Sequence, residues 1–204
     1  MPEKSESPLL SPKFAEALQF ANKIHGTQAR KGLGAPYISH LMAVSALVLE
    51  FGGNETQAIA ALLHDSAEDC GGRKMLDSVR ASFGKEVAEI VEACTDSFAE
   101  SPEEKADWRP RKEAYLAQLA DEPPTAKLVS CADKLHNLTN TLRDIGNEGV
   151  ETWKARMAMT KNGAAEKQIW YYTGCYRALS SGWTNPMLNT FGKAVEELRS
   201  LVGE

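Results

Sequence analysis

The stretch AALLHDSAED at residues 60–69 passes in one step from apolar residues to an acidic segment that contains a histidine. If the whole stretch is helical, residues four apart lie one turn apart on the same side of the helix. That spacing pairs His64 with Glu68 and Asp65 with Asp69. The sequence therefore predicts a helix whose last turn carries an imidazole and three carboxylates.

Two adjacent glycines, Gly71 and Gly72, follow this stretch and are typical of a helix C-terminus. Carboxylates in a last turn face the negative end of the helix dipole, which disfavours each of them by several tenths of a kcal/mol, about 0.3–1. We therefore expect a positive charge close to them. A bound metal ion would supply it.

The composition is that of a soluble globular protein. The chain has 204 residues, of which 43% are hydrophobic and 25% are charged, and this length suffices for a single domain with a substantial core. The net charge of −5 argues against a general nucleic-acid binder, which usually has a basic excess. It leaves room for a small anionic substrate held by a local group of Lys and Arg side chains.

Neither the N-terminus nor the cysteines indicate export. Residues Met1–Leu10 lack the basic-then-apolar order of a signal peptide, and no apolar run approaches the roughly 20 residues needed to span a membrane. Cys70, Cys94, Cys131 and Cys175 are widely spaced, which favours reduced thiols over a disulfide framework. We expect a cytoplasmic protein.

Helical periodicity and helix start and stop signals recur along the chain, and no alternating strand pattern interrupts them. Ser11-Pro12 is typical of a helix start, and Asn54 with Gln57 resembles a capping box. The fold class predicted is all-α. The expected helical regions begin at residue 12 and at residue 54 and cover 36–51, 76–82, 85–98, 102–120, 126–142, 152–179 and 186–201.

Four residues scattered over the chain, His40, His64, Asp65 and Asp133, have the chemistry that one divalent cation requires. Neutral imidazole nitrogens and carboxylate oxygens bind transition metals, and because no cysteine belongs to the set, Mn²⁺ and Fe²⁺ suit it as well as Zn²⁺. Four protein ligands would leave positions on a six-coordinate ion for water and a phosphate oxygen. An aspartate midway along a largely apolar helix, as Asp133 is, is costly if it is buried without a partner.

Each of these residues also has a structural interpretation. A single histidine on an apolar helix face, such as His40, is more often a hydrogen-bonded core residue than a ligand. Asp133 could form an ion pair with Lys134 or with Arg143. The hypothesis of a metal site rests on the occurrence of the four residues together, with Glu68 and Asp69 attached.

Four motifs carry a family resemblance: ANKIHGTQARK at 21–31, PYISH at 36–40, LLHDSAED at 62–69 and ADKLHNL at 132–138. In these motifs the chain resembles the HD-domain metal-dependent phosphohydrolases, and more closely the hydrolase domain of the RelA/SpoT type. The resemblance covers about residues 14–145, in the order that the family has.

The resemblance implies a single-domain HD-type helical bundle over residues 1–204, with the core motifs in 14–145 and the helices of 150–204 completing the bundle. The family's synthetase domain would need a long extension, so we expect a stand-alone small alarmone hydrolase. Such enzymes remove the 3′-pyrophosphate of guanosine tetra- and pentaphosphate, giving GDP or GTP and pyrophosphate, with one Mn²⁺ per chain.

The resemblance also assigns roles to residues. The metal ligands would be His40, His64, Asp65 and Asp133, and Glu68 and Asp69 would position and deprotonate the attacking water. A carboxylate near a metal can accept that proton. The alternative interpretation of the two acidic residues is a solvated helix end.

Substrate contacts are expected from Arg30, Lys31, Tyr37 and Asn137. Arg30 and Lys31 match the family's substrate-contacting pair, and a forked guanidinium beside a lysine suits phosphate oxygens. Asn137 lies one turn after Asp133, and Tyr37 either lines the pocket or only packs against it. His25 belongs to the first motif and is interpreted as structural.

The chain departs from the family pattern at two positions. Cys70 stands where the family usually has threonine, and Leu41 stands where it usually has proline. The aromatic residues Trp170, Tyr171 and Tyr172 could form an aromatic wall, but they match no family position.

Two other functions remain open. The same site would fit a phosphatase acting on the 2′-phosphate of NADPH or on a deoxynucleotide monophosphate. Alternatively, the protein could sense a nucleotide or neutralise a toxin without turnover, using the charged segment 101–111 as an interaction surface. The expected partner is a small anionic nucleotide, with no nucleic acid and no membrane, and the oligomeric state is open, a homodimer being one option.

Overall fold

The computed structural model describes residues 9–30, 34–99, 104–159 and 164–203. Within these ranges the chain forms helices and a single isolated antiparallel bridge, between Ala29 and Pro36, and it has no β-strand. The all-α prediction is confirmed. The chain divides into two compact units, Met1–Phe98 and Ala99–Glu204.

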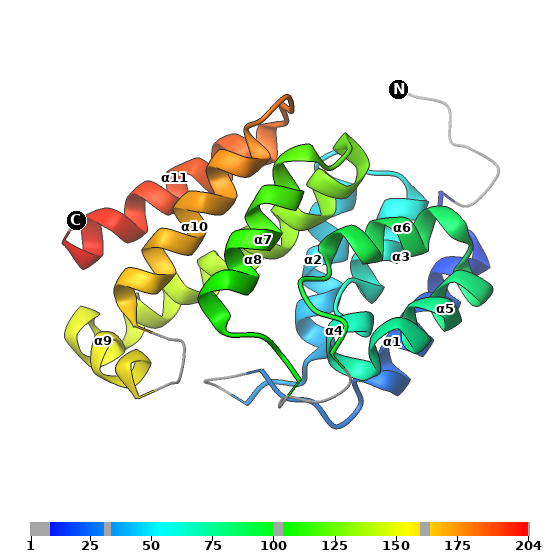
Figure 1. Cartoon of the computed structure of the whole chain (residues 1–204), viewed down its shortest axis with the longest axis horizontal. Helices are drawn as coiled ribbons and strands as arrows, with labels where there is room; N and C mark the ends of the chain where they lie inside the picture. The colour runs from blue at the N-terminus through cyan, green and yellow to red at the C-terminus, as the bar shows by residue number, and fades with distance from the viewer. Residues whose placement is uncertain (1–8, 31–33, 100–103, 160–163, 204) are drawn as a thin grey trace. The chain divides into compact units, whose positions relative to one another are not determined.

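The first unit is built around α3. Its helices are α1 (Pro12–Ile24), α2 (Ile38–Glu50), α3 (Glu55–Leu63), α4 (Ser66–Cys70), α5 (Gly72–Phe83) and α6 (Lys85–Cys94), as Figure 1 shows. Helices α1, α2 and α6 pack on α3, and α5 packs on α4 and α6. Every residue of α3 from Gln57 to Leu63 is buried, since this helix is apolar on all sides.

Local capping signals in the sequence set the starts of α1 and α3. The Ser11 side chain accepts a hydrogen bond from the backbone N–H of Lys13. Before α3, the Asn54 side chain accepts from the N–H of Gln57, and the Gln57 side chain accepts from the N–H of Asn54, at 3.0 Å each. Both predicted helix starts are confirmed, and the capping box fixes the helix that leads into the histidine-aspartate pair.

The prediction of one helix through residues 60–69 is wrong. Helix α3 ends at Leu63, His64 and Asp65 form a turn, and the short helix α4 follows. The His64 Nδ1 lies 2.8 Å from the carbonyl oxygen of Ala61, the group to which residue 65 would donate if the helix continued. The His64 side chain therefore occupies the carbonyl oxygen that would otherwise accept the next hydrogen bond of the helix.

This break changes the electrostatic interpretation of the acidic residues. Glu68 and Asp69 lie in the first turn of α4 and not in the last turn of a long helix, so the expected repulsion from a helix dipole does not apply. One part of the prediction is confirmed, since the backbone N–H of Asp69 donates to the carbonyl of Asp65 at 2.9 Å and places these two residues one turn apart. The helix also ends at Gly71, as expected, where φ is 130°.

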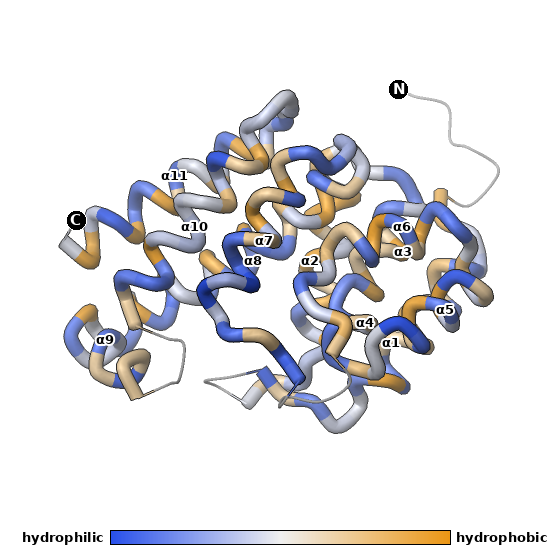
Figure 2. Tube along the Cα trace, viewed as in Figure 1, coloured by the Kyte–Doolittle hydropathy of each residue, from blue (hydrophilic) through white to orange (hydrophobic). Residues whose placement is uncertain are grey.

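The second unit is built around α8. Its helices are α7 (Trp108–Asp121), α8 (Pro124–Glu148), α9 (Val150–Ala158), α10 (Ala165–Leu179) and α11 (Pro186–Val202). Helix α8 packs against α9, α10 and α11, and α10 packs against α7 and α11. Along α11, apolar and polar segments alternate, as Figure 2 shows, and residues such as Phe191 and Leu198 are buried.

Several predicted boundaries in the later part of the chain are corrected. The helical region expected over 152–179 consists of two helices, α9 and α10. The helix expected over 85–98 ends at Cys94, because Thr95 is extended and its hydroxyl donates to the carbonyl of Val91 at 2.7 Å. The helix expected from 102 begins at Trp108, and the one expected over 126–142 extends from Pro124 to Glu148.

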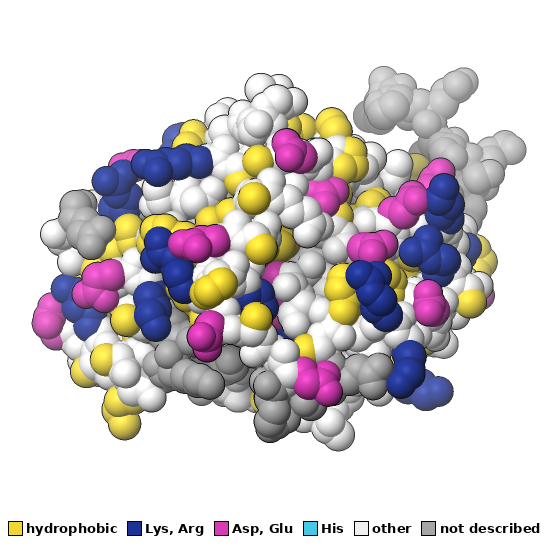
Figure 3. Space-filling model, viewed as in Figure 1, with side chains coloured by type: hydrophobic (Ala, Val, Ile, Leu, Met, Phe, Trp, Pro, Cys, Tyr) yellow, Lys and Arg dark blue, Asp and Glu magenta, His cyan; other side chains and the backbone are white. Residues whose placement is uncertain are grey.

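Charged side chains of both signs lie on the face that Figure 3 draws. On the face that Figure 3 shows, Lys and Arg side chains lie among Asp and Glu side chains and do not separate from them into blocks. Among the helices of the described residues, none is long and apolar enough to cross a bilayer.

The capping box of α3 gives a first prediction. Asn54→Ala removes the side-chain acceptor for the N–H of Gln57, so we expect the free energy of unfolding to fall by about 1 kcal/mol in urea denaturation. Asn147→Ala, at an exposed position within α8, is the matched control and should change it by less than about 0.5 kcal/mol. Equal stabilities of the wild type and the Asn54 variant would show that the capping box does not hold α3.

Candidate metal centre

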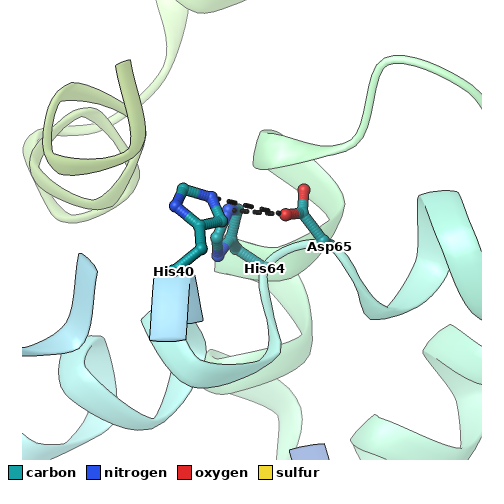
Figure 4. Close-up of side chains that lie close together, drawn as sticks. All are labelled: His40, His64 and Asp65. Atoms are coloured by element: carbon teal, nitrogen blue, oxygen red, sulfur yellow. Dashed lines mark ion pairs between the residues drawn. The ribbon is translucent and has the colours of Figure 1, made fainter. Parts of the chain in front are cut away.

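Three side chains of the first unit converge on one point, as Figure 4 shows: His40 from α2, and His64 and Asp65 from the turn between α3 and α4. One ligand atom from each lies within 4.8 Å of the others. Asp65 Oδ2 lies 3.0 Å from His64 Nε2 and 3.7 Å from His40 Nε2. The structure thus confirms that these three predicted ligands come together.

The surroundings bury the imidazoles and leave the carboxylate accessible. His40 is 1% exposed and His64 is 2% exposed, whereas the Asp65 side chain keeps 20% of its surface. The two rings face each other edge to face, with centroids 5.2 Å apart. Solvent or a small ligand can therefore reach the cluster on the side of Asp65.

The tautomer of His64 suits metal binding. Because a carbonyl oxygen only accepts, its contact with Ala61 places the proton of a neutral His64 ring on Nδ1 and leaves a lone pair on Nε2. A backbone contact of this kind on one ring nitrogen is the usual support of a metal-binding histidine. The nitrogen that faces Asp65 is therefore the one prepared to bind a cation.

The spacing of the donors also fits one ion. A lone pair on His64 Nε2 and a carboxylate oxygen 3.0 Å away repel each other unless a positive charge lies close to both, either a proton on the ring or a metal ion. Two atoms bound to one ion at about 2.1 Å each lie about 3.0 Å apart when they bind at right angles. The residues present therefore fit a divalent cation.

Tyr37 holds the carboxylate of the cluster. Its hydroxyl donates to Asp65 Oδ2 at 2.6 Å, and its ring stacks on His25 with centroids 5.3 Å apart. Tyr37 was predicted either to line a pocket or to pack. The structure adds a third role, which is to orient a predicted metal ligand.

Cys70 stands next to this cluster as a protonated thiol. Burial, reinforced by the charges of Asp69 and Asp65, raises its pKa to about 11. The thiol donates to the carbonyl of Ile24 at 3.7 Å. Because a metal binds the thiolate and not the thiol, Cys70 is a poor ligand at neutral pH.

The predicted water-activating carboxylates follow the cluster directly. Glu68 is half-buried and Asp69 is exposed in α4. Asp69 Oδ2 accepts a hydrogen bond from Gln28 Nε2 at 3.2 Å, and the Gln28 Oε1 in turn contacts His25 Nδ1. Sequence reasoning missed Gln28, although it lies in the first motif, three residues after His25, where one turn brings the two side chains together.

Of the predicted phosphate-binding pair, Arg30 is half-buried and Lys31 lies outside the described residues. The backbone N–H of Arg30 donates to the carbonyl of Ala35 at 2.8 Å, next to the bridge between Ala29 and Pro36. This pairing draws Arg30 back towards the start of α2, the helix that carries His40.

Asp133 lies in the second unit, on α8, and is 6% exposed. Lys134 Nζ contacts its Oδ2 at 2.6 Å and Asn137 Nδ2 donates to its Oδ1 at 2.6 Å, so the ion pair with Lys134 considered from the sequence is confirmed. Burial by itself lowers the pKa of Lys134, but Asp133 together with Tyr115, Tyr171 and Cys175 outweighs it and holds the pKa well above its ordinary value. Two assignments stay predictions: Asp133 as a metal ligand, and Asn137 as a contact of the nucleotide.

The aromatic residues without a family position gather between α7 and α10. The Arg109 guanidinium lies 3.6 Å from the ring centroid of Trp170, and the Trp108 ring meets Trp170 edge to face at 5.7 Å. Lys112 Nζ lies 4.8 Å from the ring centroid of Tyr171. Arg109 and Lys112 of α7 therefore already cover the faces of these rings.

The sequence pattern of the HD domain family matches residues 17–157, more than half of the chain. The chain belongs to the HD domain family. The turn that carries His64 and Asp65 lies within the matched residues.

The chain is similar to a short relative and to part of a much longer one. Guanosine-3′,5′-bis(diphosphate) 3′-pyrophosphohydrolase MESH1 of Homo sapiens is 37% identical over 141 residues, which are 68% of this chain and 72% of that protein. A probable guanosine-3′,5′-bis(diphosphate) 3′-pyrophosphohydrolase of Synechocystis sp. is 35% identical over 129 residues, which are 61% of this chain and 16% of that protein. The chain thus spans most of the short relative and about one sixth of the long one.

Two solved structures share the fold. One, described as a metazoan ortholog of SpoT that hydrolyzes ppGpp and plays a role in starvation responses, has a TM-score of 0.71 and 27% identity, over 98% of this chain and 99% of that one. The other, lmo0812 from Listeria monocytogenes EGD-e, has a TM-score of 0.67 and 26% identity, over 81% of this chain and 99% of that one. The HD-type helical fold is therefore shared well beyond the four motifs.

The contact between Tyr37 and Asp65 gives the second prediction. Tyr37→Phe removes the donor but keeps the ring on His25, so we expect Mn²⁺ binding to weaken about tenfold in isothermal titration calorimetry. Tyr176→Phe in α10 is the matched control and should bind like the wild type. Unchanged affinity in the Tyr37 variant would show that the hydroxyl does not orient the ligand.

Proposed function

We propose that the protein is a Mn²⁺-dependent hydrolase of the 3′-pyrophosphate of guanosine tetra- and pentaphosphate, giving GDP or GTP and pyrophosphate. The observation that carries the proposal is the convergence of His40, His64 and Asp65 within 4.8 Å in an HD domain. The names of the MESH1 and Synechocystis relatives, and the description of the SpoT ortholog, support this substrate.

A bound divalent ion would supply the positive charge that makes water more acidic and offsets the negative charge of the phosphoryl oxygens. His40, His64 and Asp65 are assigned to hold it, with Asp133 as the fourth ligand by family resemblance. Mn²⁺ is the proposed ion, because oxygen and imidazole donors without thiolate suit it. Under this proposal residues 1–204 act as one HD-type domain.

The reaction needs a base close to the water. Glu68 and Asp69 are assigned to orient the water and accept its proton, since both follow Asp65 within one helical turn. The water oxygen bonds to the phosphorus attached to the ribose 3′ oxygen, and the bond between that phosphorus and that oxygen breaks. The 3′ oxygen takes up a proton and pyrophosphate leaves.

The substrate contacts complete the proposal. Arg30 and Lys31 are assigned to the phosphates, where a forked guanidinium and an ammonium bind oxygen atoms well. Asn137 is assigned to the nucleotide, in addition to its hydrogen bond to Asp133. Tyr37 is assigned to the edge of the same site, where it holds Asp65.

The direct test incubates the purified chain and Mn²⁺ with guanosine tetraphosphate and separates the products by ion-exchange chromatography. We expect GDP and pyrophosphate in equal amounts, loss of turnover with a chelator, and recovery when Mn²⁺ is restored. Glu68→Gln, which keeps the shape but loses the proton acceptor, should lower kcat by about 10²-fold or more.

The alternatives give different readouts in the same assay. Free phosphate from NADPH or from a deoxynucleotide monophosphate, with intact guanosine tetraphosphate, would replace the proposed substrate. Binding of guanosine tetraphosphate without turnover in the presence of Mn²⁺ would favour a nucleotide-sensing protein over an enzyme.

The role of Asp133 gives a separate prediction. Asp133→Asn keeps an acceptor for Lys134 but loses the charge that a cation needs, so Mn²⁺ affinity in titration calorimetry should fall more than about tenfold. Asp144→Asn, on the same helix and ion-paired with Arg156 at 3.2 Å, is the control. If both variants bind Mn²⁺ like the wild type, Asp133 is not the fourth ligand.

A further inference from the structure

Gln28 occupies a fixed place between α1 and α2. Its backbone N–H donates to the carbonyl of His25 at 2.9 Å, and its carbonyl accepts from the N–H of Tyr37 at 3.0 Å. The pairing of Ala29 with Pro36 follows immediately. Because the backbone is held on both sides, the direction of the Gln28 side chain is set by the surrounding chain.

The Gln28 side chain links a buried histidine to an exposed carboxylate. Its Nε2 donates to Asp69 Oδ2 at 3.2 Å, and its Oε1 contacts His25 Nδ1. A carboxylate only accepts, so the amide nitrogen must face Asp69, and the amide oxygen then requires a proton on His25 Nδ1. Donation therefore runs in one direction, from His25 through Gln28 to Asp69.

The same residue is connected to the metal centre through Tyr37. The N–H of Tyr37 is bound to the Gln28 carbonyl, and the hydroxyl of Tyr37 is bound to Asp65. The rings of Tyr37 and His25 stack on each other. Gln28 thus contacts Asp69 directly and Asp65 through one intermediate residue.

We propose that Gln28 is a positioning residue that fixes the Asp69 carboxylate relative to Asp65, and so relative to the water that Asp69 orients. The proposal rests on the proposed hydrolase function and deepens it. An exposed aspartate samples several rotamers, and a hydrogen bond from a rigid donor selects one of them. His25, only 2% exposed and fixed by stacking, provides the rigid end of this link.

The first test replaces the amide by an apolar side chain of similar length. In Gln28→Met we expect kcat for guanosine tetraphosphate to fall about 10- to 100-fold, with KM changing less than about threefold. Gln118→Met is the matched control, because Gln118 also donates to a carboxylate, that of Glu122 at 2.9 Å, on the exposed surface of α7. The control should keep the wild-type kcat, and a wild-type kcat in Gln28→Met would overturn the proposal.

A double-mutant cycle separates positioning through Asp69 from a general loss of structure. If Gln28 acts through Asp69, Gln28→Met should slow an Asp69→Asn enzyme by less than about twofold. A full 10- to 100-fold further loss in that background would overturn the proposal. If Gln28→Met does not fold, Gln28→Glu gives the same comparison, since it keeps the shape and the acceptor for His25 but loses the donor to Asp69.

A measurement without turnover distinguishes this proposal from the proposed function. In the metal-free protein with nitrogen-15-labelled histidine, NMR should show His25 protonated on Nδ1, and Gln28→Met should shift it towards protonation on Nε2. Protonation on Nε2 in the wild type would overturn the link. Absence of pyrophosphate release together with Nδ1 protonation would reject the proposed activity and leave the hydrogen-bonded link in place.

Discussion

One carboxylate oxygen organises the candidate site. Asp65 Oδ2 accepts from the hydroxyl of Tyr37 at 2.6 Å and lies 3.0 Å from His64 Nε2 and 3.7 Å from His40 Nε2. The buried apolar helix α3 delivers His64 and Asp65 to this point, and α2 delivers His40. The lone pair on His64 Nε2 and this carboxylate oxygen repel each other unless a positive charge, on a ring proton or on a metal ion, lies close to both. The packing of the first unit therefore places His64 and Asp65 where a positive charge stabilises both of them.

The elements with local signals were predictable from the sequence. Ser11 and the Asn54–Gln57 pair cap helices through contacts within three residues, so the sequence alone contains the information. The break after Leu63 was not predictable, because no glycine or proline marks it. It depends on the His64 ring contacting the Ala61 carbonyl, and a side-chain conformation of that kind is selected by the packed structure and not by propensity.

The predicted ligands of the candidate site could be identified from the sequence, but the residues that hold them in place could not. Residue type identifies His40, His64 and Asp65, because only a few side chains bind divalent metals. The supporting contacts of Tyr37 and Gln28 depend on how residues 25–30 and 34–37 pair with each other between α1 and α2. Tyrosine and glutamine are also common as plain surface or packing residues, so their chemistry alone gives little indication of such roles.

The two departures from the family pattern preserve the chemistry that the site needs. Leu41 lies in the first turn of α2, the part of a helix where proline is tolerated, so leucine and proline are both compatible with the backbone there. The Cys70 thiol, with a pKa of about 11, stays protonated and donates to the carbonyl of Ile24, as a threonine hydroxyl in its place could also do. A thiolate at this position would compete for the metal and repel Asp65 and Asp69. Burial and the neighbouring carboxylates prevent that state, so the oxygen and imidazole donors stay the predicted ligands of the ion.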